Sequence, residues 1–227
     1  MSPHPSWIPR LPGMKRPDGV AGGHPAETPG GTNVFERQYA GGAAPWDFSQ
    51  AQPEIVALED AGTFGHRVLD VGCGTGQTAL FLAEKGHDVV GVDGAAQAIE
   101  VAKQRAAERH LDVCFRHADV LDALPELVGR FHAVTDVGFF HALTDEQRVR
   151  FASDLAGALA PGGVYAMLCF SDRVPGEWGP RRVSEAEIRA TFAGAEWRVR
   201  EVRPALLYSA VEAMPTVDAN LALVERA

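Results

Sequence analysis

The chain has few cysteines and none of the paired spacings that hold a metal. Its three cysteines, Cys73, Cys114 and Cys169, lie far apart in the 227-residue sequence, and no Cys-x-x-Cys pair occurs. A zinc cluster is therefore not expected, and no metal is assigned. Three cysteines cannot all pair with one another. Free thiols are typical of a reducing compartment, so the composition favours a cytoplasmic protein.

Positive charge and long apolar runs are also scarce. Lys and Arg number 21 against 30 Asp and Glu, which gives a formal net charge of -9 and a pI of about 5.3. Nucleic-acid binders usually present a basic face, so we expect no nucleic-acid partner. No apolar run reaches the ~18 residues of a membrane helix, and the N-terminus lacks the basic start and apolar core of a secretory signal. The sequence therefore predicts no membrane partner.

Length and proline distribution indicate one domain with an N-terminal extension. A chain of 227 residues with 46% apolar composition can bury a full core. Seven of the 15 prolines fall within residues 1–32, and this stretch is predicted to be a disordered tail. Short helices are expected within residues 33–62, where Pro53 suits a first helical turn, and the main domain over residues 63–227.

Apolar strands and amphipathic helices alternate through most of the chain. Buried strands are predicted at residues 67–71, 88–93, 113–117, 131–137 and 163–170, and helices at residues 77–85, 95–110, 144–160 and 184–192. Strand-like segments 197–202, 206–209 and 221–225 then follow without helices between them. This order predicts a doubly wound α/β fold, with a mostly parallel seven-stranded sheet and an antiparallel C-terminal hairpin.

Cap residues mark the ends of two of these helices. Thr144 with Gln147, and Ser184 with Glu187, have the spacing of capping boxes and predict helix starts. The pair Pro161-Gly162 is expected to end the first of the two helices.

A glycine-rich loop follows the first predicted strand in the segment VLDVGCGTG, residues 68–76. Gly72, Gly74 and Gly76 let the backbone turn sharply and approach a ligand, and the next helix offers its free N–H groups. The dinucleotide fingerprint is G-x-G-x-x-G, and here the third glycine comes one residue early. Asp70 would repel a pyrophosphate but could pair with an ammonium group. The loop therefore favours an amino-acid headgroup attached to a nucleoside.

Two more carboxylates follow the next two strands. Asp93, at the end of the second strand, can accept both ribose hydroxyls, and Asp119, after the third, can accept from an adenine amino group. Each acid taken singly is more often a turn or helix cap. The ordered set, together with the glycine loop, matches S-adenosylmethionine. For Cys73, between the glycines, small-residue packing is the favoured interpretation.

The chain resembles the class I S-adenosylmethionine-dependent methyltransferases over roughly residues 33–226. The matching segments, in order, are VLDVGCGTG, VVGVD, HADVLD, FHAVTDVGFFHAL and LAPGGVYAMLCF. It is also similar to small bacterial methyltransferases of the thiopurine and thiol type and to those that methylate heterocyclic toxins such as hydroxyquinolones. That similarity rests on YAGGAAPWD, GFFHAL, GPRRVSEAEIR and PALLY.

This resemblance implies small-molecule acceptors and a lid over the cofactor that carries Tyr39 and Trp46. With aromatic residues among flexible glycines, residues 33–50 have the composition of such a lid. The predicted cofactor-binding residues are Tyr39, Trp46, Asp70, Gly72, Cys73, Gly74, Gly76, Asp93, Gly94, Asp119, Val120 and Asp136.

Candidates for the acceptor side follow the fourth and fifth strands. His141 is predicted to act as a general base or to orient the acceptor, with Asp136 as a second catalytic residue. For His141, a capping or packing role remains the alternative. Phe139 and Phe140 are predicted to line the acceptor or adenine pocket, with ordinary core packing as the alternative. Trp178 is expected to cover the acceptor or to pack on the surface.

The sequence thus predicts an enzyme that moves a methyl group from S-adenosylmethionine to O, N or S of a small heteroaromatic hydroxyl or thiol. Two alternatives stay open. A nicotinamide-dependent oxidoreductase is disfavoured by the early third glycine, and a non-catalytic S-adenosylmethionine-binding regulator would keep the same sheet. The acceptor and the choice between monomer and homodimer are not determined at this level.

Overall fold

The computed structural model describes Tyr39, Ala44 and residues 46–176 and 180–227. The predicted tail, residues 1–32, lies outside this part of the chain, as does Trp178. Of the short helix expected at residues 33–39, only Tyr39 is described, and it is helical.

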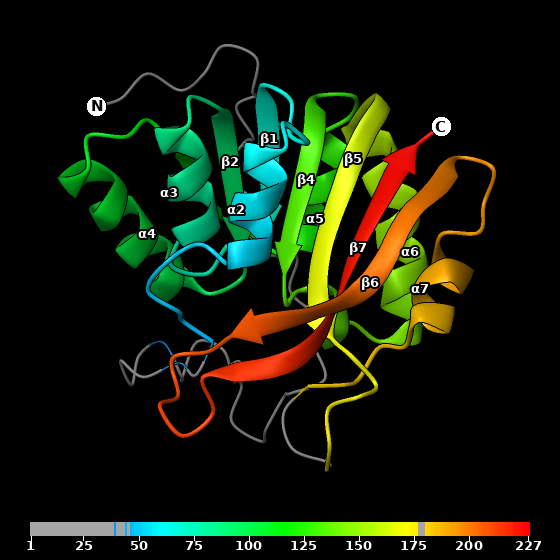
Figure 1. Cartoon of the computed structure of the whole chain (residues 1–227). Coiled ribbons are helices and arrows are strands. Elements are labelled where there is room, and N and C mark those ends of the chain that lie inside the picture. Colours follow the sequence, from blue (N-terminus) through cyan, green and yellow to red (C-terminus); the bar gives the residue numbers. More distant parts are fainter. Residues whose placement is uncertain (1–38, 40–43, 45, 177–179) are drawn as a thin grey trace, which may run out of the picture.

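A single seven-stranded sheet organises the molecule, in the order β3-β2-β1-β4-β5-β7-β6 (Figure 1). Its strands are β1 Arg67–Val71, β2 Asp88–Asp93, β3 Cys114–His117, β4 Phe131–Val137, β5 Leu159–Phe170, β6 Trp197–Tyr208 and β7 Thr216–Arg226. The first five run parallel, and β7 pairs antiparallel with both β5 and β6. The predicted fold class is confirmed. Strand order reverses between β1 and β4, which is where such sheets bind ligands.

Helices cover both faces of the sheet (Figure 1). They are α2 Pro53–Asp60, α3 Gln77–Glu84, α4 Ala96–Glu108, α5 Val120–Ala123, α6 Asp145–Ala158 and α7 Glu185–Thr191, with 3-10 turns η1 Leu124–Glu126 and η2 Phe140–Ala142. Side chains alternate along β1: Leu69 and Val71 join the core under α5 and α6, whereas Val68 joins the core under α2, α3 and α4. By the same alternation Asp70 belongs to the α3 side.

Local sequence signals explain most element boundaries. Both predicted capping boxes form: Thr144 and Gln147 exchange side-chain and backbone hydrogen bonds, as do Ser184 and Glu187. Pro53 occupies the first turn of α2. In the described residues no helix is long and apolar enough to cross a membrane.

Three boundary predictions need correction. Helix α6 ends at Ala158, and the pair Pro161-Gly162 lies inside β5 because the strand starts at Leu159. The predicted strands 197–202 and 206–209 are one strand, β6. Pro204 sits within it, and a proline is tolerated there because β6 lies at the edge of the sheet. The short α5, η1 and η2 were not predicted, since three or four residues carry no readable periodicity.

Candidate cofactor and acceptor site

The glycine loop turns between β1 and α3 at the point where strand order reverses. Gly72, Gly74 and Gly76 have φ angles of 62, 53 and 86°, in the left-handed region that favours glycine. A Cβ built at Gly74 would lie 2.7 Å from the Tyr39 hydroxyl oxygen, so a side chain there would have to displace the Tyr39 ring. The bare backbone therefore serves both the turn and the close approach of Tyr39.

Asp70 places a carboxylate under this loop. Its side chain is 2% exposed, and Oδ1 accepts a hydrogen bond of 2.8 Å from the Thr135 hydroxyl. Oδ2 is buried and completes no hydrogen bond of normal geometry with any described residue, although the Ala79 amide lowers the carboxyl pKa. Burial, reinforced by Asp136, outweighs these donors and raises the pKa of Asp70 to about 7. The unpaired oxygen fits the ammonium group of an amino-acid headgroup.

Asp93 ends β2 and fastens the glycine loop. Its Oδ2 accepts from the Gly74 backbone N–H at 2.8 Å, and its Oδ1 accepts from the Ala95 N–H at 2.7 Å. A carboxylate oxygen can accept more than one hydrogen bond, so both oxygens keep capacity for hydroxyl donors. The predicted ribose contact therefore remains a prediction, with a structural role beside it. The adjacent Gly94 is exposed.

Asp119 caps a helix. Its Oδ1 accepts from the Leu121 backbone N–H at 2.9 Å, at the N-cap of α5, and its neighbour Val120 is buried in the core. Neither residue lines the cavity described below. An adenine contact by Asp119 stays a prediction that this arrangement leaves untested.

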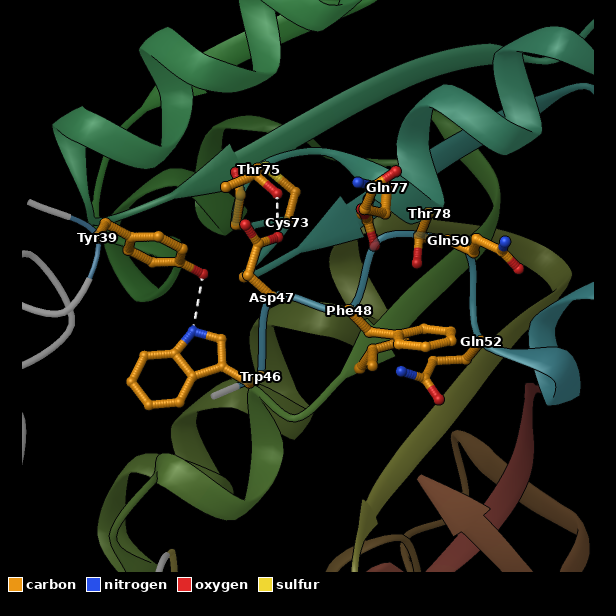
Figure 2. Close-up of a pocket in the computed structure, with 14 residues that line it drawn as sticks. Tyr39, Trp46, Asp47, Phe48, Gln50, Gln52, Cys73, Thr75, Gln77 and Thr78 are labelled. Atoms are coloured by element: carbon orange, nitrogen blue, oxygen red, sulfur yellow. Dashed lines mark hydrogen bonds between the residues drawn. The ribbon is translucent and has the colours of Figure 1, made fainter. Parts of the chain in front are cut away.

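A cavity of about 460 Å³, including its open mouth, lies between the glycine loop and the segment that precedes α2 (Figure 2). Asp70, the glycine loop and the first turn of α3 form one side of the cavity. The other side includes the aromatic residues Tyr39, Trp46 and Phe48. Cys73 lies in this lining, and burial raises the pKa of its thiol well above the ordinary value. Phe48, an aromatic residue of the predicted lid, also lines the cavity. The lining residues that the sequence analysis did not single out are Asp47, Gln50, Gln52, Thr75, Gln77, Thr78 and Val137.

Tyr39 and Trp46 meet over the glycine loop, as Figure 2 shows. The Trp46 indole N–H donates to the Tyr39 hydroxyl at 2.9 Å, and the two rings pack edge to face with centroids 6.0 Å apart. Burial, together with the charge of Asp93, raises the pKa of Tyr39, so its hydroxyl stays neutral. Trp46 is 39% exposed and forms the outer rim of the cavity.

Asp136, predicted to be catalytic, is fully buried and bonded on both oxygens. The backbone N–H of Phe139 donates to it at 2.8 Å, that of Phe140 at 3.0 Å, and the Tyr165 hydroxyl at 2.6 Å. Burial raises its pKa to about 7 against these donors. The side chain does not line the cavity. These contacts support a structural role, in which Asp136 holds the turn after β4.

His141 is only 8% exposed and packs behind the same turn. Its Nδ1 accepts from the Phe170 backbone N–H at 3.1 Å, so the neutral ring carries its proton on Nε2. Burial, with the charge of Arg148 adding to it, lowers its pKa to about 3. A general base needs a free ring nitrogen, and this arrangement supplies none. The geometry therefore favours the packing alternative.

The two phenylalanines after β4 have different surroundings. Phe140 is fully buried, stacks on Phe192 with centroids 6.0 Å apart, and lies 4.7 Å from the Arg148 guanidinium. It is core, and the prediction that it touches a ligand is not supported. Phe139 is half-buried and packs directly beneath Gly72. Val137, at the end of β4, is the residue of this segment that reaches the cavity.

Comparisons with known proteins agree with this geometry. A family model described as a methyltransferase domain matches residues 68–163. The chain is 40% identical over 187 residues to a 2-heptyl-1-hydroxyquinolin-4(1H)-one methyltransferase of Mycobacteroides abscessus, covering 78% of this chain and 82% of that one. The chain belongs to the class I S-adenosylmethionine-dependent methyltransferases. The methyltransferase is therefore an enzyme with S-adenosylmethionine as its cofactor and a small molecule as its substrate, and the oxidoreductase and non-catalytic alternatives are set aside.

Solved structures with a similar fold include methyltransferases. One, described as converting a disulfide bond into a thioacetal group during echinomycin biosynthesis, has a TM-score of 0.77 and 31% identity, covering 85% of this chain and 90% of its own. Magnesium protoporphyrin IX methyltransferase from Synechocystis PCC 6803, solved with bound S-adenosylmethionine, has a TM-score of 0.59 and 21% identity, covering 77% and 76%. At 21% identity, the similarity to the second structure supports a shared fold and nothing more.

Proposed function

We propose that the methyltransferase transfers a methyl group to the hydroxyl oxygen of a small, planar heteroaromatic acceptor. The observation that carries this proposal is the 40% identity to a hydroxyquinolone methyltransferase over 82% of that enzyme's length. The cavity supports it, because apolar side chains, among them Phe48 and Val137, form part of its wall. A flat ring system suits aromatic and aliphatic walls of this kind.

Each part of the site has a distinct task in this scheme. S-adenosylmethionine supplies an activated methyl group when bound, so the protein has to align the acceptor and exclude water. Asp70 would hold the ammonium group with its unpaired oxygen, and the loop around Gly74 would let the headgroup approach the backbone. Phe48 and Val137, from two separate segments of the chain, would orient the acceptor ring.

The acceptor hydroxyl must also lose its proton, and its own acidity supplies that step in our proposal. Asp136 has both oxygens engaged by N–H and O–H donors, and the His141 ring nitrogen that would accept a proton is already bonded to Phe170. Hydroxyl groups that ionise near neutral pH, such as those of N-hydroxylated heteroaromatics, need no base. Alignment alone contributes about 7–11 kcal/mol in favourable cases.

A thiol is the second candidate acceptor. The structural neighbour at 31% identity is described by its action on a disulfide bond, so a protein of the same fold acts on sulfur. A thiol with a pKa near 8.5 would likewise reach the site partly ionised.

Incubation with isotopically labelled S-adenosylmethionine tests the proposal. The acceptors would be a 1-hydroxyquinolone, phenols, and an aromatic and an aliphatic thiol, with heat-denatured enzyme as the control for label carried over without catalysis. Transfer of label to the oxygen of the hydroxyquinolone, located by NMR, is expected. Label found on sulfur alone would favour the thiol, and label on nitrogen alone would refute both candidates.

A further inference from the structure

The segment from Trp46 to Gln52, here named the strap, forms one wall of the cavity. Hydrogen bonds attach both of its ends to the rest of the enzyme. Phe48 and Gln50, in its middle, line the cavity and are drawn in Figure 2. Because the two attachments hold different parts of the site, each can be examined separately.

The first attachment joins the strap to the glycine loop and to α4. The Thr75 hydroxyl donates to Asp47 Oδ1 and accepts from Arg105 Nη1, and Arg105 also donates to the Thr75 carbonyl at 3.3 Å. A second nitrogen of the same guanidinium lies 3.6 Å from Asp47 Oδ2. Thr75 is buried, whereas Asp47 and Arg105 are about one quarter exposed. The bonds through a buried hydroxyl therefore count for more than the screened ion pair.

The second attachment joins the strap to the end of β6. The Gln52 side-chain amide accepts from the Tyr208 backbone N–H at 2.8 Å and donates to the Tyr208 carbonyl at 3.0 Å, so it pairs with the strand as a neighbouring backbone would. Gln52 is 4% exposed. The Phe48 ring packs against the Tyr208 ring with centroids 5.7 Å apart. This end of the strap thus belongs to the C-terminal hairpin.

We propose that Asp47, Thr75 and Arg105 form a latch that holds the strap closed over the cofactor and, through the strap, sets Phe48 and Gln50 for the acceptor. Arg105 is a positioning residue, because it does not line the cavity and acts only through Thr75 and Asp47. The acceptor half of this proposal rests on the proposed function, and the cofactor half does not. Weakening the latch lowers the fraction of enzyme in the closed form, and apparent affinity falls by the same fraction.

Arg105→Met tests the latch without touching the cavity wall. We expect the dissociation constant of S-adenosylmethionine, measured by calorimetry, to rise about three- to tenfold. The KM of the acceptor should rise with it, and kcat at saturation should stay within about twofold, since the closed complex is unchanged once formed. Thr75→Val replaces the bridging hydroxyl by a methyl group and should raise the same cofactor dissociation constant.

Lys103→Met is the matched control, because Lys103 lies on the same helix and, among the residues that the structure describes, forms an ion pair with Glu100 alone, at the surface. It should leave both constants unchanged. Arg105→Lys keeps the charge but not the forked donor, so it should recover only part of the affinity. An unchanged cofactor dissociation constant in both Arg105→Met and Thr75→Val would overturn the latch, as would a fall in kcat with unchanged affinities. The calorimetric result stands whatever the acceptor proves to be, so the latch can fail independently of the proposed function.

Discussion

The cofactor side and the acceptor side of the cavity are built in different ways. The cofactor side comes from one continuous stretch, β1, the glycine loop and the first turn of α3, with Asp93 tying the loop to β2. The proposed acceptor side combines the strap and the end of β4, and the strap packs in turn on Tyr208 at the end of β6, so three segments far apart in the sequence contribute. A contiguous motif can specify a ligand by itself, whereas a wall assembled from three segments depends on the folded sheet.

The largest effect should come from filling the glycine loop. Gly74→Val places a branched side chain where φ is 53° and where a Cβ already lies 2.7 Å from the Tyr39 oxygen. We expect loss of measurable S-adenosylmethionine binding in calorimetry. Gly157→Ala is the control, because nothing lies within 4 Å of a Cβ at that helical position, and it should stabilise the enzyme by about 0.5–1 kcal/mol. Normal binding by Gly74→Val would break the account of the cofactor side.

The next effect concerns Asp70 and has a defined pH dependence. Its folded-state pKa of about 7 lies above the ordinary ~3.9 of an unfolded aspartate. The carboxyl therefore contributes stability that is complete below pH 4 and lost as the pH rises through 7. Binding of an ammonium group needs the ionised form, so cofactor affinity should rise by up to about tenfold per pH unit towards pH 7 and level off above it.

Asp70→Asn should remove that pH dependence and weaken cofactor binding by about 1–3 kcal/mol. Calorimetry between pH 5.5 and 8.5 on both proteins, in one buffer series, makes the comparison. If the affinity for S-adenosylmethionine depended on pH equally in the two proteins, a group other than Asp70 would be responsible for the pH dependence.

Sequence alone predicted the sharp turn of the glycine loop, because Asp70 and Gly72 to Gly76 sit in one motif whose backbone and charge requirements are local. The contacts of these residues with the cofactor stay a prediction. The sequence anticipated the acceptor side poorly. Phe140 and His141 looked like ligand contacts from their place after β4, yet the turn held by Asp136 points both into the core. Asp47 lies in the predicted lid, within YAGGAAPWD, but nothing in the sequence indicated its partners, and Arg105 carried no signal, since a single Arg on an amphipathic helix is an ordinary surface residue. Only the fold brings them to Thr75.

The last effect concerns stability, not ligand binding, and involves His141. Its folded-state pKa of about 3 lies below the ordinary ~6.5 of an unfolded histidine, so its contribution is complete above pH 6.5 and is lost as the pH falls towards 3. His141→Leu removes the ring nitrogen that accepts from the Phe170 N–H and should cost about 1–3 kcal/mol at pH 7.5 in urea unfolding. His141→Asn keeps an acceptor near that N–H and should cost less. Equal losses in the two variants would show that the hydrogen bond is unimportant.

The central claim is that the enzyme aligns an acidic acceptor without proton transfer to His141. The most direct test measures kcat/KM for wild type and His141→Asn on a series of heteroaromatic hydroxyls of graded pKa, at one pH. The account predicts one common ratio between the two enzymes across the series, with rates that follow the ionised fraction of each acceptor. A ratio that grows by about 100-fold from the most to the least acidic acceptor would show that His141 removes the proton, and would contradict the account.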